Sequence, residues 1–246
     1  QKTKLYSINC NQNNLKEIKK NGIAFKSLNK EIKERYYASI IDRTGKMIFG
    51  LANMDTYENF VHKTLIKDFQ NKNIILDLNF SKELIKKIII NNYKNNYICV
   101  CGTSAHKVYK IKKLLKKIDT LIMNKQECLN LTNMKSIKDS INYLNKQNKK
   151  LNIIITNGKN AVNSLIDNTY YLSYPQILKL KNENGAGDSL TALFNYFYCN
   201  NYDKLDSLNK GICGGMLQAS GYNKNKKLYL RKIDQLSKSI KFKTFK

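Results

Sequence analysis

Short apolar runs alternate with segments of helical periodicity through the middle of the chain. Because continuous apolar strands are typical of sheets that are covered on both faces, each run predicts a buried strand. The runs lie at residues 74–76, 97–101, 120–123 and 151–156. Helices are predicted between them at residues 81–90, with Ser81 as the capping residue, and at about 104–117, 126–131 and 134–147. The alternation predicts an α/β fold in three layers, α/β/α, around a mostly parallel central sheet.

Antiparallel hairpins are predicted on either side of this region. The β-rich runs 36–41 and 46–52 flank the polar turn Asp42-Arg43-Thr44-Gly45, and a second pair of runs lies at 161–166 and 169–174. Helices are predicted to follow at 188–199 and at about 205–220. Open parallel sheets bind ligands beyond the carboxyl ends of their strands, so we expect the functional residues directly after the strands.

Charge is the most unusual feature of the composition. The chain has 246 residues and a formal net charge of +26, which is typical of nucleic-acid-binding proteins. Lys, Asn and Ile, whose codons are rich in A and T, are all frequent here, while there is one Pro and no Trp. The lysines are also spread along the chain rather than gathered in one block. We therefore attribute the charge to coding bias and expect no specific nucleic-acid partner, although such a field attracts phosphorylated substrates.

The apolar runs and the cysteines argue against a membrane protein and against a zinc-binding protein. No apolar run approaches the roughly 20 residues that a membrane-spanning helix needs, so we expect no membrane partner. The six cysteines form no C-x-x-C pair, which argues against a structural zinc site. We interpret them as free thiols in a reducing compartment and expect a cytoplasmic protein.

The strongest candidate for chemistry is the segment Asn184-Gly185-Ala186-Gly187-Asp188, at the start of a predicted helix. Its glycines let the backbone approach a ligand closely, and a helix N-terminus offers free N–H groups to an anion such as a phosphate. Asp188 lies in the first helical turn, where a carboxylate can take a proton from an attacking hydroxyl. A glycine-rich loop with Asp188 as a helix cap explains the same residues without any ligand.

Three motifs together resemble those of the ribokinase-like (PfkB) kinases. Gly185-Ala186-Gly187-Asp188 resembles the signature near the C-terminus of that family. Asn124-Lys125-Gln126-Glu127 follows a predicted strand, as the N-x-x-E motif of the family does. Ile155-Thr156-Asn157-Gly158 ends a strand, where the family carries a T-x-G nucleotide loop. The order and the spacing of the three motifs also match those of the family.

A closer resemblance, to pseudouridine kinases, lies in the first hairpin. Residues 37–42 and 50–55 are similar to their lid segment, which has a tyrosine-alanine strand, a turn and an A-D-M-D-like stretch. Residues 75–79 are similar to a strand that ends in D-x-N, and residues 103–107 to a T/V-S-x-x-K segment. The resemblance implies one ribokinase-like domain over residues 1–246, with a lid at about 36–55. Because the family's N-terminal aspartate and G-G-x-x-x-N segment are not found, we expect this domain to be truncated at its N-terminus.

The resemblance implies ATP-dependent phosphorylation of a nucleoside or sugar hydroxyl, and the lid favours pseudouridine as the acceptor. The implied roles are those of catalytic base for Asp188, anion hole for Gly185, Ala186 and Gly187, nucleotide contact for Asn124, Thr156 and Gly158, water-mediated Mg²⁺ binding for Glu127, and substrate contact for Tyr37. ATP and Mg²⁺ are the implied cofactors, with a monovalent cation as a further candidate. Since small β-lids of this family often mediate dimers, a homodimer through the lid is a candidate assembly.

Other interpretations of these residues stay open at this stage. Asn124 and Glu127 fit a capping box, and Tyr37 can pack within the hairpin. Thr156 and Gly158 can simply end a strand. Several residues stand where the family pattern has others, namely Asn53, Cys101, Gly102, Ala161 and Asn182. Another PfkB specificity, such as ribose, fructose or adenosine, and a degenerate nucleotide-binding protein without activity are therefore alternatives to a pseudouridine kinase.

Overall fold

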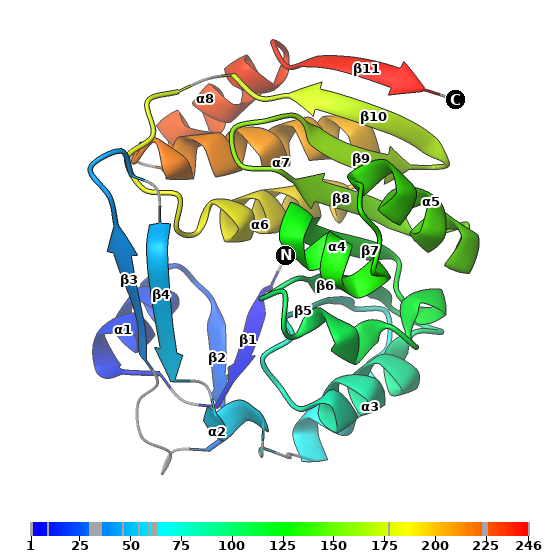
Figure 1. The fold of residues 1–246 in the computed structure, drawn as a ribbon. Coiled ribbons are helices and arrows are strands. Elements are labelled where there is room, and N and C mark those ends of the chain that lie inside the picture. The colour runs from blue at the N-terminus through cyan, green and yellow to red at the C-terminus, as the bar shows by residue number, and fades with distance from the viewer. Residues whose placement is uncertain are drawn as a thin grey trace.

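The central sheet is mixed, with a parallel half and an antiparallel half. The computed structural model describes residues 2–8, 10–29, 36–45, 47–53, 55–58, 60, 63–176, 178–222 and 226–245. Within these residues, seven strands form one sheet in the order β11-β10-β9-β8-β7-β6-β5 (Figure 1). They are β5 (Asn73–Leu76), β6 (Tyr97–Cys101), β7 (Thr120–Asn124), β8 (Asn152–Thr156), β9 (Val162–Ile166), β10 (Thr169–Tyr174) and β11 (Lys241–Phe245). β5 to β8 pair in parallel, as predicted, and β8 to β11 pair antiparallel.

Helices cover both faces of this sheet, which confirms the three-layer α/β/α fold. Successive residues of a strand point to opposite faces. In β6, Ile98 belongs to the core cluster shared with α3 (Lys82–Asn92), α4 (Lys125–Thr132) and α5 (Ile137–Gln147). Its neighbour Cys99 belongs to the cluster on the other face, with α6 (Ala186–Tyr198), α7 (Lys204–Ala219) and α8 (Lys226–Ser237). Among the described residues, none of the helices is both long and apolar enough to span a bilayer.

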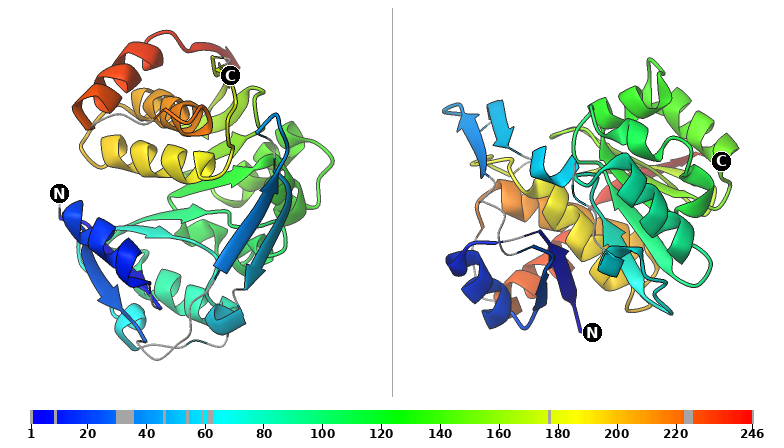
Figure 2. Two further views of the ribbon diagram at one scale, coloured as in Figure 1. Left: turned by 90° about the vertical axis from the view of Figure 1, so that its left-hand side faces the viewer. Right: turned by 90° about the horizontal axis from the view of Figure 1, so that it is seen from below.

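A hairpin stands in front of the carboxyl ends of the parallel strands. It consists of β3 (Tyr36–Ile41) and β4 (Met47–Asn53) and lies outside the central sheet. In Figure 1 it lies on the side toward which β8 points, and in the left view of Figure 2 it faces the viewer. It is the predicted lid, of which Lys46 and Met54 lie outside the described residues.

Elements near both ends of the chain were not predicted from the apolar pattern. β1 (Lys4–Ser7) and β2 (Ala24–Ser27) pair in parallel as a separate two-stranded sheet and are joined by α1 (Gln12–Lys20). α2 (Asp55–Glu58) and the 3₁₀ helix η1 (Lys63–Ile66) lie between the hairpin and β5. Toward the C-terminus, α8 packs on α7, and β11 adds a strand to the edge of the sheet.

The α-helix predicted at about 104–117 is wrong. The structure has turns there and two 3₁₀ helices, η2 (Val108–Ile111) and η3 (Leu115–Lys117). The buried apolar residues Val108, Ile111 and Leu114 recur every third position, and a 3₁₀ helix aligns residues at that spacing on one side. The buried Lys110 is also drawn inward, where its ammonium group donates to Leu78 O at 3.1 Å and to Phe80 O at 2.8 Å. The periodicity of apolar residues in the sequence cannot predict these long-range contacts.

Candidate functional site

Asn124 ends β7 and begins α4, and it forms the capping box that its sequence pattern allows. The Asn124 Oδ1 atom accepts a hydrogen bond from Glu127 N at 2.9 Å, and Glu127 Oε2 accepts one from Asn124 N at 2.8 Å. The Glu127 side chain is buried at the carboxyl edge, against Gly102 at the end of β6. A Cβ atom at Gly102 would lie 2.2 Å from Glu127 Oε2, so only glycine leaves room for this carboxylate. Burial raises the pKa of Glu127, and the hydrogen bond from Asn124 N partly offsets that rise.

Thr156 ends the neighbouring strand at the same edge of the sheet. β7 and β8 pair in parallel with Thr156 opposite Asn124, so the two predicted nucleotide contacts lie side by side. Two residues later, Gly158 has a φ of +58°, a left-handed conformation that favours glycine. Apart from its neighbours in the chain, none of the described residues has an atom within 4 Å of the place where its Cβ would be. The backbone therefore turns sharply at Gly158, and the space beside it is accessible to a ligand.

α6 begins at the glycine loop without a capping side chain. In α1, α3, α4, α5 and α7, a Ser, Asn or Asp side chain accepts a hydrogen bond from the first turn. At the same position α6 has Gly185, with a φ of +77°. Among the described residues, no partner bonds to the backbone N–H groups of Gly187 and Asp188, which the first turn cannot satisfy internally. These donors and the positive end of the helix dipole are available to an anion.

Asp188 projects from this first turn at the carboxyl edge of the sheet. α6 runs against the direction of β6, since Asn195 donates to the Cys99 Sγ atom at 3.4 Å and Thr191 contacts the Cys101 thiol. One turn before Thr191, Asp188 therefore lies beyond the carboxyl end of β6. The Asp188 residue is exposed, and within the described chain its carboxylate has no hydrogen bond or ion pair. The glycine loop, Asn124, Glu127 and Thr156 thus share one edge.

Tyr37 packs within the hairpin. Its ring lies over Gly50, and its hydroxyl donates to the Met47 Sδ atom at 2.9 Å. Ser39, two residues along the same strand and so on the same face, accepts a hydrogen bond from Asn184 Nδ2 at 2.6 Å. Tyr37 is therefore on the face of the hairpin that meets the glycine loop, which we call the inner face.

Two other segments that the sequence pattern singled out meet each other beside this edge. The Lys107 Nζ atom donates to Asn79 Oδ1 at 2.8 Å, and Thr103 Oγ1 accepts from Leu78 N at 2.9 Å. The segments at 75–79 and 103–107 are thus joined just after β5 and β6. Sequence reasoning missed the neighbouring Lys110, whose ammonium also pairs with Glu58 of α2 at 2.5 Å. Because Lys110 is charged and lies in a segment predicted to be a helix, the sequence gave no indication that its side chain is buried.

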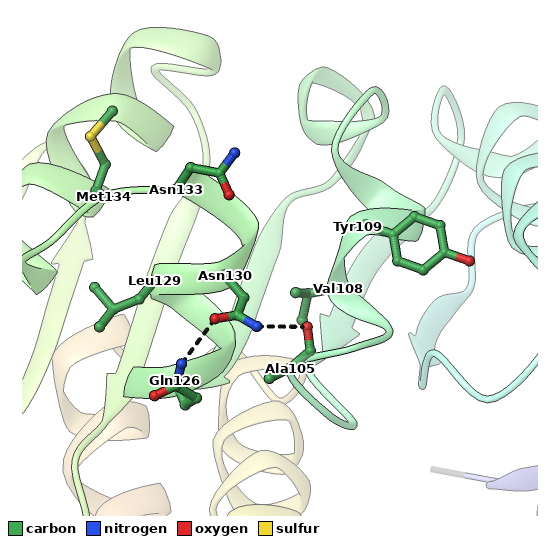
Figure 3. A pocket seen from close by; sticks show the side chains of 8 residues that line it. All are labelled: Ala105, Val108, Tyr109, Gln126, Leu129, Asn130, Asn133 and Met134. Atoms are coloured by element: carbon green, nitrogen blue, oxygen red, sulfur yellow. Dashed lines mark hydrogen bonds between the residues drawn. The ribbon is translucent and has the colours of Figure 1, made fainter.

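A hollow of about 540 Å³ lies on the other side of α4. Figure 3 shows it between η2 and α4, with Asn130 Nδ2 donating to Ala105 O at 3.3 Å and Gln126 Nε2 donating to Asn130 Oδ1 at 2.9 Å. It is lined by Ala105, Val108, Tyr109, Gln126, Leu129, Asn130, Asn133 and Met134. None of the predicted site residues lines this hollow. We therefore do not assign the reaction to it.

The edge offers few direct ligands for a metal ion. Among the described residues, no group of three or more His, Cys, Asp or Glu side chains could hold one. Mg²⁺ keeps several waters and is usually bound through one or two carboxylates together with substrate phosphates. A single buried carboxylate at Glu127, near an anion-binding helix N-terminus, fits a hydrated Mg²⁺ that arrives with a nucleotide.

Comparison with known proteins identifies the family. Residues 9–223 match the pfkB family of carbohydrate kinases. The chain belongs to this family. It is therefore a carbohydrate kinase, a phosphotransferase that uses an alcohol as the acceptor. No curated protein sequence matches the chain significantly.

Solved structures of sugar and nucleoside kinases share the fold. A putative sugar kinase from Clostridium perfringens is 17% identical, with a TM-score of 0.74 over 99% of this chain and 82% of that one. A nucleoside kinase from Methanocaldococcus jannaschii, an archaeal member of the ribokinase family, is 16% identical, with a TM-score of 0.68 over 95% and 80%. A fructokinase from Vibrio cholerae O395, bound to fructose, ADP and calcium, is 12% identical, with a TM-score of 0.73 over 94% and 84%. At these identities the likeness shows the ribokinase-like fold and not the substrate.

Proposed function

We propose that this pfkB-family kinase transfers the γ-phosphoryl group of ATP to a hydroxyl of a nucleoside or sugar at the glycine loop. The observation that carries the proposal is the first turn of α6, which has Gly185 in place of a capping side chain and an exposed Asp188. Each of α1, α3, α4, α5 and α7 uses a side-chain oxygen at the equivalent place. A free set of N–H donors beside a carboxylate supplies both charge stabilisation and proton transfer.

Asp188 is proposed as the base for the acceptor hydroxyl. Its carboxylate is exposed and within the described chain has no competing cation, so it is free to accept the proton of an incoming hydroxyl. A base placed in this way contributes about 10²–10⁴-fold to the rate. The Gly185 to Gly187 turn is proposed as the anion hole for the transferring group. Gly187 N is unbonded among the described residues, while Ala186 N also donates to Glu183 O at 3.2 Å.

ATP and Mg²⁺ are proposed as the cofactors. Asn124, Thr156 and Gly158 lie at the carboxyl ends of β7 and β8, where the nucleotide would meet them, and Glu127 would hold Mg²⁺ through water. Bound Mg²⁺ would neutralise charge on the ATP phosphates. The Vibrio cholerae fructokinase binds ADP and calcium, and a double mutant of it binds ADP and potassium, which supports a nucleotide with metal ions and keeps a monovalent cation as a candidate. The capping box does not compete with these roles, because it uses only Asn124 Oδ1 and Glu127 Oε2.

Pseudouridine is the acceptor that we propose, on the resemblance of the hairpin to the lid of pseudouridine kinases. Tyr37 lies on the inner face of the hairpin, where it would contact the acceptor. The test is an ATP-dependent assay with pseudouridine, uridine, adenosine, ribose and fructose, with the phosphorylated product measured by mass spectrometry. We expect the highest kcat/KM with pseudouridine and phosphate on its 5′-hydroxyl. A higher kcat/KM with ribose, fructose or adenosine would show a different specificity of the same family.

A further inference from the structure

The turn of the β3–β4 hairpin contacts the residues that lead into the glycine loop. Gly45, in this turn, has a φ of +86°, and a Cβ atom on it would lie 2.6 Å from the backbone carbonyl of Lys181. Glu183 N donates to Gly45 O at 3.3 Å, and Glu183 Oε1 accepts from Met47 N at 2.8 Å. With the bond from Asn184 Nδ2 to Ser39 Oγ at 2.6 Å, these form what we call the tip contacts. The hairpin therefore meets the loop by close packing and by three hydrogen bonds.

The segment 181–184 is held from its other side by α7. Lys181 N and Asn182 N both donate to Ala219 O, at 2.9 and 3.0 Å. Gln218 Nε2 donates to Asn184 O at 3.3 Å. These bonds fix the segment to the end of a buried helix, so it is a firm support for the tip of the hairpin.

Glu183 connects the hairpin directly to the first turn of α6. While its N–H and its carboxylate bond to the hairpin, its carbonyl oxygen accepts a hydrogen bond from Ala186 N at 3.2 Å. Ala186 is the first residue of α6 and a member of the proposed anion hole. One residue thus bonds both to the element that would cover the acceptor and to the element that would bind the phosphate.

The tip contacts can determine the position of the hairpin relative to the glycine loop. An isolated two-stranded hairpin is marginally stable in water, so its position depends on what holds its ends. At its base, Glu58 of α2 pairs with the buried Lys110. At its tip, the three bonds are polar, and Glu183 and Asn184 are only half-buried. Bonds of this kind can open and re-form at modest cost.

We propose that Glu183 and Asn184 are positioning residues that join the seating of the hairpin over the acceptor to the organisation of the anion hole. The proposal rests on the proposed kinase function for its kinetic consequence. When the tip contacts are made, the acceptor hydroxyl and the phosphate site are held in one geometry, which is what phosphoryl transfer requires.

The test compares Glu183→Ala, Glu183→Gln and Glu17→Ala in the full chain. Glu17 is an exposed glutamate on α1, so Glu17→Ala controls for loss of a surface carboxylate. Hydrogen exchange of the free protein reports the hairpin, and the KM values for acceptor and ATP report the reaction. Glu183→Ala should speed exchange of the Met47 amide and raise the acceptor KM by about tenfold, with the ATP KM changed by less than about twofold. Glu183→Gln keeps an oxygen for Met47 N–H and should lie between Glu183→Ala and the unsubstituted protein, and Glu17→Ala should change neither quantity.

Asn184 is tested with its partner in a double-mutant cycle. Ser39→Ala and Asn184→Ala each remove one side of the same bond, so each should raise the acceptor KM, and the double variant should raise it no further. Additive effects would contradict the pairing. Unchanged exchange of Met47 in Glu183→Ala, or equal rises in both KM values, would overturn the proposal. If the protein phosphorylates no acceptor, the proposed function fails, while hydrogen exchange still decides whether Glu183 holds the hairpin.

Discussion

At the scale of single residues, the glycines around the proposed site are of two kinds, those that packing of the fold requires and those that it does not. Gly102 makes room for the Glu127 carboxylate, and Gly45 makes room for the Lys181 backbone. Gly187 differs, because no described residue outside its own helical turn has an atom within 4 Å of the place where its Cβ would be, and its φ is not positive. The fold therefore does not require glycine at position 187, and we attribute it to the close approach of a phosphate.

Gly187→Ala should accordingly separate stability from activity. Alanine in the first turn of α6 should raise the free energy of unfolding by about 0.5–1 kcal/mol, because glycine is the weaker helix former. The same methyl group should obstruct the phosphate and lower kcat/KM by at least about tenfold. Urea unfolding and steady-state kinetics measure the two effects. An active, stabilised variant would show that the phosphate does not approach the backbone at this residue.

Residue-level prediction from the sequence succeeded where the pattern was local. The capping box of Asn124 and Glu127 is formed, and Ser81 caps α3. Glu183 was not predicted to have a role, because its bond to Met47 spans 136 positions and no local pattern encodes it. The catalytic and binding roles of the site residues remain predictions.

At the scale of elements, apolar runs and caps located most of the strands and helices between residues 73 and 219. The second predicted hairpin is formed by β9 and β10, and α6 and α7 lie within two residues of their predicted bounds. The failures have physical causes. The segment at 104–117 follows a three-residue spacing of buried side chains, and β1, β2 and β11 are exposed strands without a continuous apolar run. Their strand pairing depends on partners distant in the sequence.

The outer face of the β3–β4 hairpin leads to a prediction about assembly. Tyr36, Ile40, Phe49 and Leu51 are 53%, 60%, 54% and 49% exposed, and strand pairing places them on the face opposite Ser39. Because exposed apolar surface of this kind is typical of protein interfaces, we expect a homodimer that buries this face. Ile40→Lys should convert the dimer to a monomer in analytical ultracentrifugation. Ile90→Lys, at an exposed isoleucine of α3, is the matched control for added charge. A wild-type monomer at micromolar concentration would contradict the prediction.

At the scale of the whole molecule, the net charge of +26 should act on the nucleotide and not on nucleic acid. A field of this sign attracts ATP, and salt screens it over distances of about 10 Å. Raising the salt from about 50 to 200 mM should therefore raise the KM for ATP by about two- to threefold. The rise should be the same in sodium and choline chloride if it reflects screening rather than a cation site. Tight binding of a DNA duplex that weakens steeply with salt would instead indicate a nucleic-acid function.

We propose that the family fold places a working phosphoryl-transfer centre at residues 185–188. The variant Asp188→Asn tests this placement, because asparagine keeps the size and the exposed position of the side chain but cannot accept the proton. The measurement is kcat for ATP-dependent phosphorylation of the best acceptor, together with the Kd for ATP. We predict that kcat falls by about 10²–10⁴-fold while the Kd for ATP changes by less than about twofold. A variant that keeps the wild-type kcat would contradict the assignment of Asp188 and with it the proposed site.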